Sequence, residues 1–135
     1  MKKLDEVIEY SNKLTILYVE DDQASRDMIT MILEEFFKEV IVGVDGEDGY
    51  NKFLNNEIDI IITDINMPKL DGIALSKKIR EKDSDIPILI LTAHDEKHFY
   101  EESKKYGINN YLLKPIDLEQ FADTIATVVK KISQK

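Results

Sequence analysis

Side chains that can bind cations and phosphoryl groups follow the short apolar runs of this sequence, at the points where the runs end. They are Glu20, Asp21 and Asp22 after the first run, Thr63 and Asp64 at the end of the third, Thr92 after the fourth and Lys114 after the fifth. In an open parallel sheet, ligands bind outside the carboxyl ends of the strands, so these side chains are expected to meet. Carboxylate oxygens from neighbouring strand ends suit Mg²⁺, which keeps several waters when it binds. The pattern therefore indicates a magnesium site beside a lysine.

The acidic cluster itself favours a bound cation. Close like charges raise one another's pKa and destabilise the fold unless a cation relieves them. The chain has no cysteine, which excludes a thiolate metal site and a disulfide framework. Each residue taken alone has a plainer interpretation. Acids after a strand are common helix caps, Lys114 can be an exposed lysine, and Thr92 an ordinary residue at the end of a strand.

Alternating apolar runs and helical stretches predict the elements that position these groups. The predicted strands are residues 15–19, 40–43, 59–63, 88–91 and 111–113. The third and fourth runs are almost continuously apolar, which is typical of central strands with helices on both faces. The expected fold is α/β, a doubly wound five-stranded parallel sheet with five flanking helices.

Helical periodicity and capping residues mark the segments between the strands. Helices are predicted over residues 23–37, 46–54, 71–80, 95–106 and 117–132. Asp71 is placed to cap the third helix, and Gly107 supplies a permissive stop after the fourth. Asp117, followed three residues later by Gln120, resembles a capping box at the start of the last helix.

Length and composition indicate one soluble globular domain. The chain has 135 residues, of which 43% are hydrophobic and 33% charged, with no apolar stretch long enough to cross a bilayer. Residues 14–132 are expected to form the domain and 133–135 a tail. Residues 1–13 are an N-terminal extension with Leu4, Val7 and Ile8 at helical spacing, which predicts either a short helix or a frayed terminus.

The charge balance bears on partners and location. Twenty-seven acidic residues against 18 basic ones give a net charge of −9, which repels phosphate backbones and argues against direct nucleic-acid binding. Nothing at the N-terminus has the pattern of a cleaved signal, and cysteine is absent. A cytoplasmic protein without membrane insertion is therefore expected.

Four motifs taken together resemble the receiver domain of two-component response regulators, in its chemotaxis-regulator-like single-domain form. They are YVEDD at 18–22, TDINMP at 63–68, LTA at 91–93 and LLKP at 112–115. The resemblance covers about residues 14–132, in order and with the expected spacing. It implies a flavodoxin-like sheet with strand order 2-1-3-4-5.

The resemblance implies a role for each acidic residue. Asp64 is the phosphoacceptor and also a magnesium ligand, and Asp21 is a direct ligand. Glu20 holds the ion mainly through water, while Asn66 adds its backbone carbonyl. Mn²⁺ can substitute for Mg²⁺ at such a site. Asp22, the residue after the acid pair, is expected to cap the following helix.

Phosphoryl transfer needs a nucleophile in line and neutralisation of charge on the transferring oxygens, and Lys114 is the expected ammonium. The resemblance implies that the Thr92 hydroxyl forms a hydrogen bond to the phosphoryl group. This bond would allow Tyr111 to change its packing. Thr92 and Tyr111 are therefore the expected switch pair, although Tyr111 alone has the pattern of a half-buried strand residue. Pro115 is a candidate cis proline because the family usually has one after the lysine.

Two residues are expected at the rim of the site, Asn66 and His94. Side chains there can admit or obstruct the water that hydrolyses an acyl phosphate, so both are candidates for tuning its lifetime. His94 would make the lifetime depend on pH near a pKa of roughly 6.5, or it is a plain surface residue beginning the fourth helix.

Gly49 departs from the family, which more often has alanine there, and predicts a helix weaker by roughly 0.5–1 kcal/mol and more mobile.

The expected function is signalling rather than turnover of a substrate. A histidine kinase or phosphotransfer protein donates a phosphoryl group to Asp64, and the altered face binds a downstream protein. Intrinsic autophosphorylation and autodephosphorylation accompany this role. The sequence stops where its last helix stops, so the chain is either a stand-alone regulator or a fragment of a larger protein.

Three other classes fit less well. An aspartate-nucleophile phosphohydrolase has a second aspartate two positions after the nucleophile, where this chain has Asn66. A flavin-binding protein of the same topology needs a Ser/Thr- and Gly-rich loop after its first strand, where this chain has acids. A receiver-like domain that binds partners without phosphorylation would not need the combination of Asp64, Thr92 and Lys114.

Overall fold

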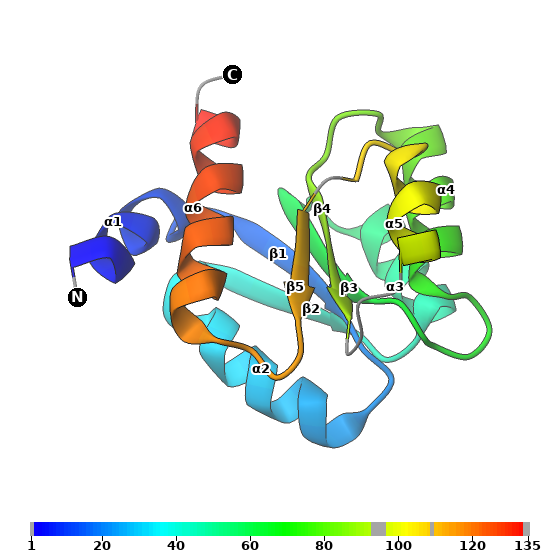
Figure 1. The fold of residues 1–135 in the computed structure, drawn as a ribbon, viewed down its shortest axis with the longest axis horizontal. Coiled ribbons are helices and arrows are strands. Elements are labelled where there is room, and N and C mark those ends of the chain that lie inside the picture. The colour runs from blue at the N-terminus through cyan, green and yellow to red at the C-terminus, as the bar shows by residue number, and fades with distance from the viewer. Residues whose placement is uncertain (1, 93–96, 109, 134–135) are drawn as a thin grey trace.

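The computed structural model describes residues 2–92, 97–108 and 110–133. Its centre is a parallel sheet in the order β2-β1-β3-β4-β5, with helices on both faces (Figure 1). The strands are β1 Thr15–Val19, β2 Glu39–Gly43, β3 Ile60–Asp64, β4 Ile88–Thr92 and β5 Asn110–Leu113. The expected fold class and strand order are thus confirmed, with boundaries within one residue of the expected ones.

The two strands expected to be central are buried along their whole length. Every residue of β3 and of β4 is buried, because helices cover both faces of these isoleucine- and leucine-rich runs. The register pairs Val19 with Thr63 and Asp64 with Leu91. The carboxyl ends of β1, β3 and β4 therefore meet at one edge of the sheet.

Helices cover both faces of the sheet (Figure 1). They are α2 Gln23–Phe36 and α6 Leu118–Ser133 on one side, and α3 Gly46–Asn55, α4 Gly72–Lys82 and α5 Lys97–Lys104 on the other. Alternate residues of the strands enter the two cores, as the two-residue period of a strand requires. Phe36 and Phe121 meet edge to face at 5.3 Å between ring centroids and join α2 to α6.

Aspartates cap the helices that follow β1 and β3, as the sequence predicted. Asp22 accepts a hydrogen bond from the Ser25 amide at 2.9 Å, and Asp71 accepts one from Ala74 at 2.8 Å. Gly107 has a φ of +73°, which confirms its role as a permissive stop. The predicted start of the fourth helix at residue 95 lies outside the described residues.

Residues 1–13, for which the sequence predicted either a short helix or a frayed terminus, contain a sixth helix, α1 Lys2–Ser11. It lies beside α6 (Figure 1). Val7 is buried in the same core as Phe36, and the Ser11 hydroxyl donates to the Phe36 carbonyl. So short a helix is marginal alone, and these tertiary contacts supply what its local sequence lacks.

Gly49 has a packing reason that the sequence did not reveal. A Cβ at this position would lie 2.7 Å from the Cγ2 atom of Val19. Glycine therefore lets α3 approach β1 closely, so the lower helix propensity accompanies a buried contact.

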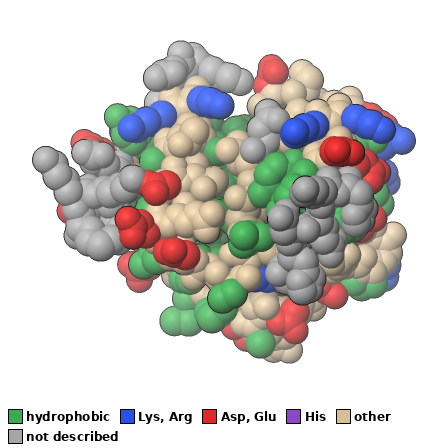
Figure 2. Space-filling model, viewed as in Figure 1, with side chains coloured by type: hydrophobic (Ala, Val, Ile, Leu, Met, Phe, Trp, Pro, Cys, Tyr) green, Lys and Arg blue, Asp and Glu red, His purple; other side chains and the backbone are tan. Residues whose placement is uncertain are grey.

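The surface carries charges of both signs. On the face drawn in Figure 2, acidic side chains lie on the left near α1 and α6 and also on the right and at the bottom, and basic ones lie in small separate groups. In the part of the chain that the structure describes, no helix combines the length and apolar character needed to cross a membrane.

Candidate functional site

Three carboxylates meet where β1 and β3 end. Glu20, Asp21 and Asp64 each offer an oxygen within 4.8 Å of those of the other two. The side chains differ in exposure, because Glu20 is 0% exposed and Asp64 9%, whereas Asp21 faces solvent. The structure thus assembles the acidic cluster that the strand ends predicted, with one ligand reachable from solvent.

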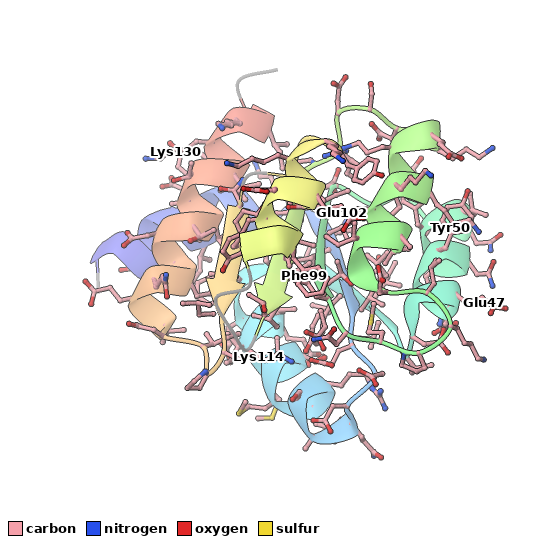
Figure 3. The ribbon with its side chains drawn as sticks, turned by 45° about the vertical axis from the view of Figure 1, so that its right-hand side comes forward. Glu47, Tyr50, Phe99, Glu102, Lys114 and Lys130 are labelled. Atoms are coloured by element: carbon pink, nitrogen blue, oxygen red, sulfur yellow. The ribbon has the colours of Figure 1, made fainter. Side chains whose placement is uncertain are left out.

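Lys114 lies against this cluster, in the segment that follows β5 (Figure 3). Its Nζ is 2.7 Å from Oε1 of Glu20 and 3.5 Å from Oδ2 of Asp64. Its backbone amide donates to the Thr92 carbonyl at 2.8 Å, which ties it to the end of β4. The Lys114–Pro115 peptide bond is cis, as the resemblance implied. The ammonium therefore bridges two carboxylates from different strands.

Burial and like charge dominate the electrostatics of the cluster. Burial and, after it, the charge of Glu20 together raise the pKa of Asp64 to about 7, although the ammonium of Lys114 opposes the rise. Burial and the charge of Glu20 also raise the pKa of Asp21. At Lys114 burial opposes the charge, but the hydrogen bond to Glu20 and the charge of Asp64 outweigh it and raise its pKa.

These residues fit a hard divalent cation. Every ligand atom that the cluster offers to a metal is a carboxylate oxygen, the ligand type that Mg²⁺ prefers. A divalent charge would also relieve the repulsion that raises the pKa of Asp64 and Asp21. Asn66 is exposed two residues beyond β3. The contribution of its backbone carbonyl stays a prediction.

The loop after β3 folds back against the phosphoacceptor candidate. The Gly72 amide donates to the Ile65 carbonyl at 2.8 Å, and a Cβ on Gly72 would lie 2.3 Å from the carbonyl oxygen of Asp64. Only glycine permits this approach. The Ile65 amide donates to Oδ1 of Asp64 at 3.0 Å and thereby orients its carboxylate.

Arg26 shapes the loop between β1 and α2, a role that sequence reasoning missed. Its Nη1 donates to the carbonyls of Glu20 and Asp21, each at 3.0 Å. Asp22 points instead to the Ser25 amide. The structure therefore confirms Asp22 as a helix cap and leaves Glu20 and Asp21 as the acid pair.

The two predicted switch residues lie on neighbouring strands. Thr92 ends β4 and is buried, whereas Tyr111 is half-buried on β5. The Tyr111 hydroxyl hydrogen-bonds the Ser103 hydroxyl and is 3.0 Å from the Ile108 carbonyl oxygen, and its ring centroid is 4.3 Å from that of Tyr100. Tyr111 is thus attached to α5. Sequence reasoning missed Ser103. In the sequence it is a single small polar residue, and its burial is seen in the structure.

Tyr18 is a further residue near the site; sequence reasoning placed it in a strand and in the YVEDD motif but gave its side chain no role. Its ring is fully buried, and its hydroxyl lies 3.4 Å from Oε1 of Glu20. Burial and the charge of Glu20 raise the pKa of Tyr18, so its hydroxyl keeps the proton that it can donate. The predicted rim residue His94 lies outside the described residues.

The chain belongs to the response regulator receiver domain family, whose model matches residues 16–126. It is 32% identical over 133 residues to the transcriptional regulatory protein RprY of Bacteroides fragilis. That match covers 96% of this chain and 55% of RprY. The chain therefore spans about half the length of the curated relatives that it matches.

Solved structures agree with this assignment. The N-terminal domain of an uncharacterized protein from Wolinella succinogenes is 31% identical, with a TM-score of 0.81 and coverage of 90% of this chain and 99% of that one. The match to the CheX-CheY-BeF₃-Mg²⁺ complex from Borrelia burgdorferi has 27% identity and a TM-score of 0.78, and covers 85% of this chain and 88% of that one.

Proposed function

We propose that the chain accepts a phosphoryl group on Asp64 from a histidine kinase or phosphotransfer protein, in a reaction that depends on Mg²⁺. The observation that carries this proposal is the meeting of Asp64, Glu20, Asp21 and Lys114 at one edge of the sheet. The same edge is where an open α/β sheet binds its ligands. Family membership supports a signalling role.

The proposed chemistry uses the Asp64 carboxylate as the nucleophile. One of its oxygens attacks phosphorus, the bond from phosphorus to the donor atom breaks, and the donor leaves with the electron pair. The product is an acyl phosphate on Asp64. The Ile65 amide fixes Oδ1 at 3.0 Å, and the Lys114 ammonium lies near enough to pair with the transferred oxygens.

Glu20, Asp21 and Asp64 are the residues that would hold the metal, with Asn66 contributing its backbone carbonyl. Bound there, Mg²⁺ supplies positive charge to the transferring phosphoryl oxygens. The name of the Borrelia burgdorferi complex described above includes both Mg²⁺ and BeF₃. This supports the proposal that the present chain binds Mg²⁺. Mn²⁺ is proposed to substitute.

A change in partner binding is proposed to follow from Thr92 and Tyr111. The buried Thr92 lies at the end of β4, next to the strand that carries Asp64. A bond from the Thr92 hydroxyl to the phosphoryl group would allow Tyr111, whose hydroxyl is bonded to Ser103 of α5, to change its packing. Binding of a downstream protein would then depend on the phosphorylated state. Intrinsic autophosphorylation and autodephosphorylation, and lifetime tuning by Asn66 and His94, belong to the same proposal.

Transfer from a small phosphodonor tests the proposal. Acetyl phosphate with Mg²⁺ is expected to add one phosphoryl group to the wild-type chain and none to Asp64→Asn, as measured by intact mass. Omission of Mg²⁺ is expected to prevent the addition. Stable labelling of Asp64→Asn would show that another residue accepts the group.

Mg²⁺ binding gives a separate prediction. Millimolar Mg²⁺ is expected to raise the melting temperature near neutral pH, because it binds the folded cluster and relieves its repulsion. Asp21→Asn should largely abolish this rise, since Asp21 is the ligand that solvent reaches. Asp27→Asn, an exposed carboxylate on α2, is the matched control and should keep the rise. An equal rise in Asp21→Asn and wild type would place the cation elsewhere.

A further inference from the structure

Glu20 is a carboxylate without solvent-exposed surface, and three donors surround it. Lys114 Nζ lies 2.7 Å from Oε1, the Asp22 amide 3.3 Å from Oε2, and the Tyr18 hydroxyl 3.4 Å from Oε1. A buried carboxylate is costly unless such donors satisfy it. The direction in which Glu20 presents its oxygens therefore depends on these three groups.

Among these donors, the Tyr18 hydroxyl is held by a rigid, buried ring. Tyr18 lies two residues before Glu20, so both side chains project from the same face of the chain. Its ring is fully buried in the core beneath α2, and its hydroxyl is also 3.5 Å from the Ser25 carbonyl oxygen. Lys114, in contrast, has a flexible stem and keeps 22% of its side chain exposed.

We propose that Tyr18 is a positioning residue that orients Glu20 toward the divalent cation. This inference rests on the proposed function. When Lys114 pairs with a phosphoryl group, Glu20 shares that ammonium with a second anion. The Tyr18 hydroxyl then remains a fixed donor to Glu20, because the strand and the core hold its ring. The phenol contributes through Glu20 and does not touch the metal.

The test is Tyr18→Phe, which removes one oxygen atom, with Mg²⁺ affinity measured by titration calorimetry. The variant is expected to bind Mg²⁺ about three- to tenfold more weakly, the loss typical of one ordinary hydrogen bond, because the contact of 3.4 Å between the hydroxyl and Glu20 is long. Tyr50→Phe is the matched control and should bind like wild type. Tyr50 lies on α3, remote from the cluster (Figure 3), and its hydroxyl is not needed for its ring contacts with Phe53 and Lys78.

A second background shows whether Tyr18 acts through Glu20. In Glu20→Ala, which removes the acceptor of the Tyr18 hydroxyl, the further change Tyr18→Phe is expected to leave the Mg²⁺ affinity unchanged, whereas a purely structural effect would appear in both backgrounds. Tyr18→Met, which also lacks the hydroxyl, should weaken binding in the same way. Tyr18→Phe and Tyr18→Met are checked for folding by circular dichroism, so that affinities are compared between folded chains.

The outcomes separate the two proposals. A wild-type chain that binds no Mg²⁺ overturns the proposed function itself. A wild-type chain that binds Mg²⁺, with Tyr18→Phe binding equally well, overturns only the role of Tyr18. A lowered melting temperature in Tyr18→Phe with unchanged Mg²⁺ affinity makes Tyr18 a core residue and also overturns that role.

Discussion

Replacing Asp64 by asparagine is expected to raise the free energy of unfolding by about 1–3 kcal/mol at pH 8 in Mg²⁺-free buffer. The wild-type carboxylate is buried beside Glu20, and its pKa is raised from 3.8 to about 7. Above that pH the folded chain must hold a charge that the unfolded chain holds at little cost. Asparagine removes this charge, and the lost attraction to Lys114 limits the gain.

The sign of the pH dependence follows from proton binding. Between about pH 4 and 7 folded Asp64 keeps a proton that the unfolded chain has released, so the contribution of Asp64 to wild-type stability falls as pH rises through this window. Asp64→Asn lacks this titration. The two chains should therefore differ least near pH 4, differ increasingly toward pH 7, and keep a constant difference above it.

Urea unfolding of both chains across pH 4 to 8 measures this effect. Asp27→Asn, an exposed carboxylate of α2, is the control and should change stability by less than about 0.5 kcal/mol. Millimolar Mg²⁺ should shrink the difference between wild type and Asp64→Asn, because the cation stabilises the wild-type cluster. A variant less stable than wild type at pH 8 without Mg²⁺ would show that Asp64 is not strained by its neighbours.

Replacing Lys114 by alanine is expected to act in the opposite direction. Its ammonium is 2.7 Å from Glu20, which has no exposed surface, and removing it leaves the carboxylate buried without this cation. Removal of one partner from a buried pair typically costs about 3–5 kcal/mol, and the partial exposure of Lys114 places the expected loss at about 2–4 kcal/mol.

The measurement is again urea unfolding at pH 8, with and without Mg²⁺. The cation should restore part of the lost stability, since Lys114→Ala keeps all three carboxylates and should still bind it. Acquisition of phosphate should nevertheless be slow and signalling poor, because the ammonium that pairs with the phosphoryl group is gone. Lys130→Ala, at the opposite end of α6 from Lys114 (Figure 3), should be neutral. Equal stability of Lys114→Ala and wild type would mean that the ion pair contributes nothing.

The fold was predictable because its signals are local and repeated. The isoleucine-rich runs of β3 and β4 and the caps Asp22 and Asp71 each follow from a few adjacent residues. The docking of α1 was not predictable in the same way. It depends on Val7 and on the bond from Ser11 to Phe36, and the two partners of that bond are 25 positions apart in sequence.

The candidate site was predictable to the level of which side chains meet. Strand ends placed Glu20, Asp64 and Lys114 at one edge, but spacing does not determine which carboxylate the ammonium approaches more closely. The hydroxyl contacts of Tyr18 and Ser103 depend on the direction of buried side chains, which a linear pattern does not encode.

Peptide mapping after treatment with acetyl phosphate and Mg²⁺ tests the central claim most directly. Rapid digestion and mass spectrometry should find one phosphoryl group on the peptide that contains Asp64, sensitive to neutral hydroxylamine as an acyl phosphate is. The modification should disappear when Mg²⁺ is chelated and when Asp64 is replaced by asparagine. A chain that stays unmodified with Mg²⁺ present, or a phosphoryl group on a peptide without Asp64, would contradict the proposal.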